Sequence, residues 1–110
     1  MGLSTDPEFP AIARRMRVGF GDTVFQLDFR DAEHMSFIGL EGPLKGAADT
    51  VRYTAVKIRE QVFMVYWHEP STGANVVHVE DFEQGILHTN IAGADGTFVN
   101  MRGYLLLEAS

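Results

Sequence analysis

The sequence predicts a single all-β domain, a small antiparallel barrel of about eight strands preceded by a short helix. Three observations lead to this fold class. Turn-forming residues interrupt the chain at short intervals, the segments between them have the length of strands, and the connections have the length of hairpin loops. Consecutive strands joined by hairpins form an antiparallel meander. Closing that meander into a barrel or a half-closed cup removes its two exposed edges.

The turn residues locate each predicted element in order. A short helix is expected around residues 10–15. Strands are expected at residues 16–20, 23–29, 34–41, 49–60, 62–69, 75–82, 85–92 and 96–108. Their turns lie at Gly21-Asp22, Arg30-Asp31, Glu41-Gly42-Pro43, Glu60-Gln61, Pro70 to Gly73, Glu83-Gln84-Gly85 and Gly93 to Gly96. We therefore divide the chain into an N-terminal segment, residues 1–15, part of which could derive from cloning, and one barrel domain, residues 16–110.

Composition narrows the function classes. The chain has 110 residues, of which 45% are hydrophobic, enough for one domain with one core. Its net charge of −6 and its scattered basic residues argue against nucleic acid or an anionic membrane as a partner. The absence of cysteine excludes disulfides and thiolate metal sites. No targeting or membrane-spanning segment is evident, so we expect a cytoplasmic protein.

Hairpin geometry assigns the two faces of the predicted sheet, because residues opposite each other across a turn share a face. The turn at Glu60-Gln61 places Val56 opposite Val65. The face that collects most apolar residues is assigned to the interior: Val56, Ile58, Phe63, Val65, Trp67, Val77, Val79, Leu87, Ile91, Phe98 and Leu106. The outer face collects Tyr53, Lys57, Arg59, Met64, Tyr66, His68, His78, Glu80, His88 and Met101. A one-residue bulge would reverse the assignment beyond it.

The same register sends several polar side chains inward: Arg52, Glu69, Asp81, Asn100, Arg102 and Tyr104. One interpretation is structural, with Glu69 and Arg52 paired at the rim of the barrel and Asp81 in solvent. The other is a ligand pocket with Trp67 and Tyr104 as walls and the charged groups as orienting residues. In a catalytic pocket Glu69 is the best candidate acid or base, because a carboxylate beside an indole is partly desolvated.

Metal and nucleophile chemistry find less support. His78 and His88 are expected to be cross-strand neighbours on the outer face with Tyr66 beside them, but no third metal ligand is evident, so we expect no metal or other cofactor. Ser36 and Ser71 lack a glycine-framed elbow for a nucleophile. A homodimer is an open alternative, through an outer apolar patch of Met64, Tyr66, Val99 and Met101.

Four segments resemble the domain of molybdenum cofactor biosynthesis protein F, the MoaF-like group. They are Val51-Arg52-Tyr53-Thr54-Ala55, residues 62–70 (VFMVYWHEP), residues 76–82 (VVHVEDF) and Gly96-Thr97-Phe98. The resemblance covers most of the chain from about Gly19 onward. It implies a compact lipocalin-like barrel of the calycin type, and it does not define a biochemical activity.

A shorter motif is similar to one in phenolic acid decarboxylases, another group of lipocalin-like barrels. Residues 67–73 (WHEPSTG) match their Trp-Thr-Glu-Pro-Thr-Gly motif, in which the glutamate handles protons, and Glu69 stands at that position. Those enzymes also use two tyrosines on the first strand and an arginine. Here Arg52 and Tyr104 are the available substitutes, and the first strands carry Val18, Phe20, Phe25 and Phe29.

We therefore expect a small-molecule binding protein whose barrel holds an aromatic or anionic ligand. The expected ligand-binding residues are Arg52, Trp67, Asp81, Asn100, Arg102 and Tyr104. The alternative is a small lyase or decarboxylase acting on an aromatic or carboxylate substrate, with Glu69 as general acid/base. A third hypothesis is an interaction module that uses the outer patch.

Overall fold

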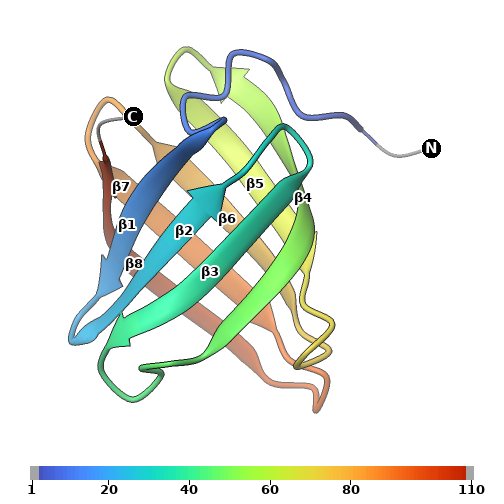
Figure 1. Cartoon of the computed structure of the whole chain (residues 1–110), viewed down its shortest axis with the longest axis vertical. Coiled ribbons are helices and arrows are strands. Elements are labelled where there is room, and N and C mark those ends of the chain that lie inside the picture. The colour runs from blue at the N-terminus through green and yellow to red at the C-terminus, as the bar shows by residue number, and fades with distance from the viewer. Residues whose placement is uncertain (1–2, 109–110) are drawn as a thin grey trace.

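Eight antiparallel strands close into a barrel in the computed structural model, which describes residues 3–108 (Figure 1). The strands are β1 (Arg14–Phe20), β2 (Thr23–Phe29), β3 (His34–Glu41), β4 (Ala48–Arg59), β5 (Val62–His68), β6 (Asn75–Asp81), β7 (Ile86–Ala92) and β8 (Phe98–Leu107). Each strand pairs with the next, and β8 pairs with β1. The predicted all-β barrel and the positions of its strands are confirmed, and closure leaves no free sheet edge.

The predicted N-terminal helix is wrong, because residues 10–13 form turns and residues 3–108 contain no helix. Ala13 adopts a left-handed backbone with φ of 61°, which ends the turn and directs the chain into β1. Phe9 and Ala11 are buried instead of lying on an amphipathic surface helix. With no helix present, residues 3–108 offer none that could span a membrane.

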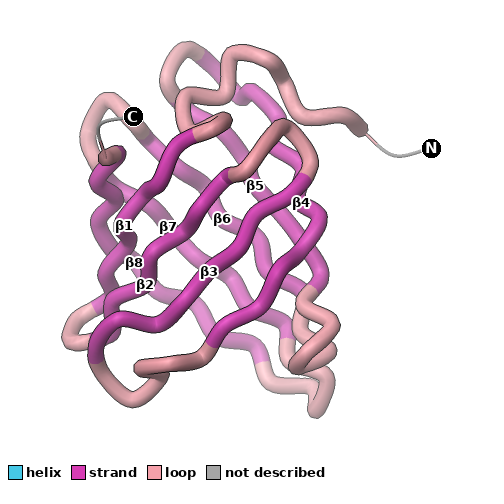
Figure 2. The backbone as a smooth tube through the Cα atoms, in the orientation of Figure 1, coloured by secondary structure: helices cyan, strands magenta, loops and turns pink. Residues whose placement is uncertain are grey.

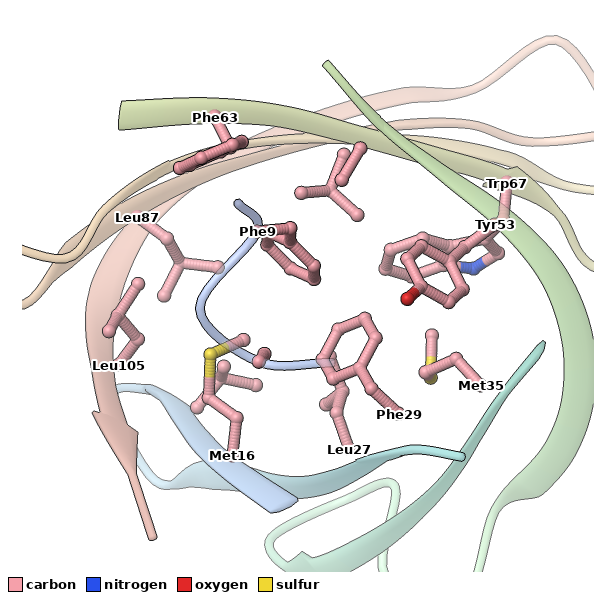
Figure 3. Packing of buried hydrophobic residues seen from close by; sticks show 14 of the residues in the cluster. Phe9, Met16, Leu27, Phe29, Met35, Tyr53, Phe63, Trp67, Leu87 and Leu105 are labelled. Atoms are coloured by element: carbon pink, nitrogen blue, oxygen red, sulfur yellow. The ribbon is translucent and has the colours of Figure 1, made fainter. Parts of the chain in front are cut away.

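The two ends of the barrel differ (Figures 1 and 2). The N-terminal segment lies at the same end as the β2–β3, β4–β5 and β6–β7 loops. There Phe9 enters the barrel and packs edge-on against Phe29, Phe63 and Phe82, with ring centroids 5.2, 5.4 and 5.7 Å away, as Figure 3 shows for the first two. We call the end of the barrel that Phe9 fills the plugged end. The opposite end, which carries the β1–β2, β3–β4, β5–β6 and β7–β8 loops, is the open end.

The predicted faces are wrong for β4, because a bulge between Lys57 and Arg59 shifts its register against β5. Tyr53 pairs with Trp67, so Tyr53 points into the barrel. The inward residues of β4 are Val51, Tyr53 and Ala55, all buried. Val56 falls on the outer face, and Ile58 is 57% exposed. A single extra residue reverses alternation along a strand, which accounts for the difference.

The faces of β6 and β8 are also reversed relative to the prediction. Trp67 pairs with Val76 and not with Val77, so Val76, His78 and Glu80 point inward. In β8, Thr89 pairs with Met101, and Phe98 is 67% exposed. Each error is a shift of one residue across a hairpin loop. The predicted interior positions that the structure buries in the core are Phe63, Val65, Trp67 and Leu87, while Ile91 is partly buried against it.

Candidate functional site

A cavity of about 380 Å³ occupies the open end of the barrel. Most of its wall is apolar and aromatic: Val18, Phe20, Phe25, Leu27, Phe37, Leu44, Ala47, Ala48, Trp67, Val76, Ile91 and Met101. The polar lining consists of Thr23, Glu69, Ser71, Thr72, His78 and Thr89. An apolar cavity with a few convergent polar groups is the usual form of a small-molecule site.

Close contact between β8 and β1 shapes one wall of the cavity. A Cβ atom on Gly103 would overlap the carbonyl oxygen of Gly19 and the ring of Phe20. Because Gly103 has no side chain, the Phe20 ring can occupy the inner side of β8 and line the cavity. On the outer side the Tyr104 ring packs over Gly19, where a Cβ atom on Gly19 would overlap the ring.

Glu69 lies at the mouth of the cavity, where two neighbours orient its carboxylate. Nε1 of Trp67 donates a hydrogen bond to Oε2 at 3.1 Å, and Oγ1 of Thr72 donates to Oε1 at 3.1 Å. The backbone N–H of Gly73 donates to the Glu69 carbonyl oxygen at 2.8 Å, which closes the β5–β6 loop. The carboxylate is therefore held in a defined position at the edge of the cavity.

Asp49, at the start of β4, ties that loop to the rest of the rim. Its Oδ2 accepts a hydrogen bond from the backbone N–H of Ser71 at 3.1 Å, and its Oδ1 accepts one from Thr50 at 2.8 Å. Hydrogen bonding from the Ser71 side chain, followed by the backbone hydrogen bonds, holds the pKa of Asp49 below its ordinary value. The ionised form of Asp49 therefore links the β3–β4 and β5–β6 sides of the mouth.

A buried histidine and glutamate lie deeper in the barrel, side by side on the inner face of β6. His78 is 4% exposed and Glu80 is 0% exposed. Nδ1 of His78 is 3.0 Å from Oε2 of Glu80. The His78 ring lies on the cavity wall, edge-on to Trp67 with 4.8 Å between ring centroids. We call His78 and Glu80 the inner pair.

The inner pair is polar, whereas most of the buried side chains around it are apolar. Oε1 of Glu80 is buried without a hydrogen-bond partner among residues 3–108. Burial, followed by the negative charges of Asp31 and Glu80, raises the pKa of Tyr53 far above its ordinary value, and the Tyr53 hydroxyl donates to the Asp31 carbonyl oxygen at 2.6 Å. Tyr53 is therefore a neutral structural donor.

Comparison with known proteins identifies the family of this barrel. The sequence profile of the MoaF-like family matches residues 12–106. The chain belongs to the MoaF-like family. A crystal structure of a protein from Burkholderia vietnamiensis, provisionally described as a beta-lactamase, is similar with a TM-score of 0.84 and 26% sequence identity, covering 90% of this chain and 96% of that one. No protein with a curated description matches the sequence. The resemblance drawn from the four sequence segments is confirmed.

The MoaF-like barrel brings together two of the seven site residues expected from the sequence, Trp67 and Glu69. Arg52 lies on the outer face, with its guanidinium 3.7 Å from Glu33, so the expected rim pair between Arg52 and Glu69 is wrong. Asp81 lies at the plugged end, where its Oδ1 accepts hydrogen bonds from the backbone N–H groups of the β6–β7 loop. Neither Arg52 nor Asp81 points into the cavity.

The expected inward orientation is also wrong for the three residues of β8. Asn100 donates a hydrogen bond to Asn90 at 2.8 Å and is exposed, as is Arg102. Tyr104 lies on the outer face against Gly19. All three errors follow from the one-residue shift between β7 and β8.

The two other surface hypotheses also depend on the register of the strands. His78 pairs with Thr89 inside the MoaF-like barrel, whereas His88 pairs with Val79 and is exposed, so the two histidines lie on opposite faces and cannot share a surface metal. Within residues 3–108 no cluster of three potential His, Asp or Glu ligands occurs. The proposed apolar patch is divided, because Met101 lines the cavity.

The inner pair is the functional feature that sequence reasoning missed. In the run Val76-Val77-His78-Val79-Glu80 the alternation is unambiguous, but it buries either the two valines or the histidine and glutamate, depending on one residue of register. Hydrophobicity favours burying the valines. The β5–β6 loop has the length that pairs Trp67 with Val76, and this register turns the histidine and the glutamate inward.

Proposed function

We propose that this MoaF-like barrel binds a small, neutral and largely apolar molecule in its open end. The observation that carries the proposal is the cavity itself, in which an aromatic wall meets three oriented groups, Trp67, Glu69 and His78. A volume of about 380 Å³ is within the range of small-molecule sites and suits a compound with one or two rings.

The charges around the cavity favour a neutral ligand over the anionic one expected from the sequence. None of the described residues that line the cavity is a lysine or an arginine. An anion would therefore lose its hydration next to Glu69 with no permanent positive charge in return, which is unfavourable in an apolar site. Aromatic ligands remain favoured, because Phe20, Phe25 and Phe37 line the wall together with Trp67.

Tryptophan fluorescence tests the proposal directly, because Trp67 is the only tryptophan and lies on the cavity wall. Titration with a panel of neutral one-ring and two-ring compounds is expected to change its emission in a saturable way. Val76→Phe fills the cavity and is expected to abolish the response, whereas Val77→Phe places the same ring on the outer face and is expected to retain it. Equal binding by both variants would place the ligand elsewhere and contradict the proposal.

The second candidate is a small lyase or decarboxylase with Glu69 as general acid/base. It is favoured by the motif shared with phenolic acid decarboxylases and by the fixed position of the Glu69 carboxylate at the cavity mouth. Against it, no tyrosine or arginine belongs to the described cavity lining, so the groups that would activate a phenolate and hold its carboxylate lack counterparts. Binding is therefore the better supported function.

Turnover assays separate the two candidates. Consumption of 4-hydroxycinnamate that disappears in Glu69→Gln would establish the lyase. Hydrolysis of nitrocefin should be measured in parallel, because the similar Burkholderia protein is provisionally described as a beta-lactamase. We expect neither substrate to be turned over. The homodimer and the cytoplasmic location stay predictions.

A further inference from the structure

The inner pair has no evident structural purpose. Glu80 pairs across the sheet with Phe63 on one side and with Leu87 on the other, both buried and apolar. An apolar side chain at position 80 would fill the same space without the desolvation penalty of a buried carboxyl group. Replacing buried ionic groups by apolar ones is often neutral or stabilising, so the inner pair is poorly explained as a device for stability.

The contact between the two side chains determines which nitrogen of His78 is free. Glu80 engages Nδ1 at 3.0 Å, so Nε2 is the ring nitrogen available to a molecule in the cavity. With Glu80 ionised, Nδ1–H donates to the carboxylate and Nε2 is a hydrogen-bond acceptor. The carboxylate also stabilises the imidazolium that forms if Nε2 takes a proton, because the positive charge then lies next to a negative one.

We propose that His78, supported by Glu80, is a proton acceptor on the inner wall of the cavity, and that the ligand is an aromatic compound with a weakly acidic hydroxyl group. This inference rests on the proposed function and names the chemical class of the ligand. The ligand O–H bond breaks, its electron pair stays on the ligand oxygen, and the proton moves to Nε2. The resulting oxyanion faces an imidazolium whose charge is balanced by Glu80, so the net charge of the three groups is unchanged.

Among the titratable groups around the cavity, His78 is the one suited to accept a proton from the ligand. Directly after β5 the titratable group of the cavity is Glu69, whose two oxygens already accept hydrogen bonds from Trp67 and Thr72. On β4 the titratable group is Tyr53, whose hydroxyl donates to a backbone oxygen. The residues that face His78 from β1 and β7 are Phe20 and Thr89, which do not titrate in the accessible range.

A pair of coloured probes tests the inference. 4-Nitrophenol carries a weakly acidic hydroxyl and changes its absorption spectrum when it ionises, whereas 4-nitroanisole has the same ring without the acidic proton. At a pH where free 4-nitrophenol is mostly un-ionised, binding to the wild-type protein is expected to produce the nitrophenolate band. Both probes are expected to quench Trp67, so that fluorescence measures affinity independently of ionisation.

Three variants complete the test. His78→Gln is expected to abolish the nitrophenolate band and weaken 4-nitrophenol binding about 10- to 100-fold, through the loss of a hydrogen bond to a charged group. Binding of 4-nitroanisole is expected to weaken far less, because this probe has no proton to give to His78. Glu80→Gln keeps an acceptor for Nδ1 but removes the charge, so it is expected to abolish the band with a smaller loss of affinity. His88→Gln removes an exposed histidine from β7 and is expected to change nothing.

The outcomes separate the inference from the function on which it rests. Binding of 4-nitroanisole by all three variants shows that their cavities are folded. If both probes bind and the nitrophenolate band is absent, or persists in His78→Gln, the proton-accepting role is wrong and the binding function stands. If neither probe binds to the wild-type protein, the proposed class of aromatic ligand fails and the inference fails with it.

Discussion

Replacing both members of the inner pair should harm the fold less than replacing His78 alone. His78→Leu removes the partner of a fully buried carboxyl group, while the double variant His78→Leu/Glu80→Met leaves an apolar interior of similar volume. The ion pairs elsewhere within residues 3–108 have exposed members, so they do not offer this comparison. The non-additive result is the signature of two groups that are both buried and in contact.

The magnitude follows from the burial of the pair. Leaving a buried polar group without its hydrogen-bond partner costs about 1–3 kcal/mol, and more when the group is charged. The upper end, about 3 kcal/mol, applies to His78→Leu because the carboxyl group of Glu80 is fully buried. For a domain of this size, that loss lowers the melting temperature by roughly 12 °C. The double variant should unfold within about 1 kcal/mol of the wild-type protein, or be more stable.

Urea unfolding followed by circular dichroism at neutral pH measures these free energies. The wild type, the single variants His78→Leu and Glu80→Met, and the double variant are compared under one condition. His88→Leu, a substitution of the same kind on the outer face of β7, serves as the control and should stay within about 0.5 kcal/mol of the wild type. If the losses of the two single variants simply add in the double variant, the pairing of His78 with Glu80 inside the barrel is refuted.

Three further predictions concern the plugged end, the wall and the rim. Phe9→Ala should destabilise the barrel by about 3–5 kcal/mol because Phe9 fills the plugged end, while the exposed Phe98→Ala should cost less than about 0.5 kcal/mol; equal losses in urea unfolding would contradict the plug. Gly103→Ala should lower the free energy of unfolding by about 1–3 kcal/mol, because the added methyl group overlaps Gly19 and Phe20 of β1. An unchanged melting temperature would show that β8 and β1 can move apart at this position. Because hydrogen bonds from Ser71 lower the pKa of Asp49 in the folded state, its stabilisation is present above the ordinary value of 3.8 and is lost as the pH falls through the lowered pKa. The stability difference between wild type and Asp49→Asn should therefore shrink on acidification below pH 3.8, and a constant difference would exclude the Asp49 carboxylate as its source.

The positions of the strands were predictable because turn chemistry is local. Residues with a positive φ, such as Gly21, Gln61 and Gly85, stand at hairpin turns where a left-handed backbone is required, and such positions are recognisable without knowledge of the rest of the fold. The expectation that the meander closes was also reasonable, because edge strands are avoided in small all-β proteins.

The interior was predictable only where register was certain. Along β5 the prediction holds, since Phe63, Val65 and Trp67 all point inward. Shifts of one residue at the bulge near Lys57, at the six-residue loop after His68 and at the β7–β8 hairpin reversed the faces of β4, β6 and β8. No pattern in a single strand can reveal such a shift, because both faces of β6 alternate equally well. The plug by Phe9 was missed for a different reason, since it depends on a long-range contact of a segment outside the sheet.

A crystal structure of the protein in complex with 4-nitrophenol tests the binding site most directly. The account predicts that the ring lies in the open end of the barrel against Trp67, with its oxygen within hydrogen-bond distance of Nε2 of His78. A ring bound on the outer wall, or an open end filled by the protein's own side chains, would contradict it.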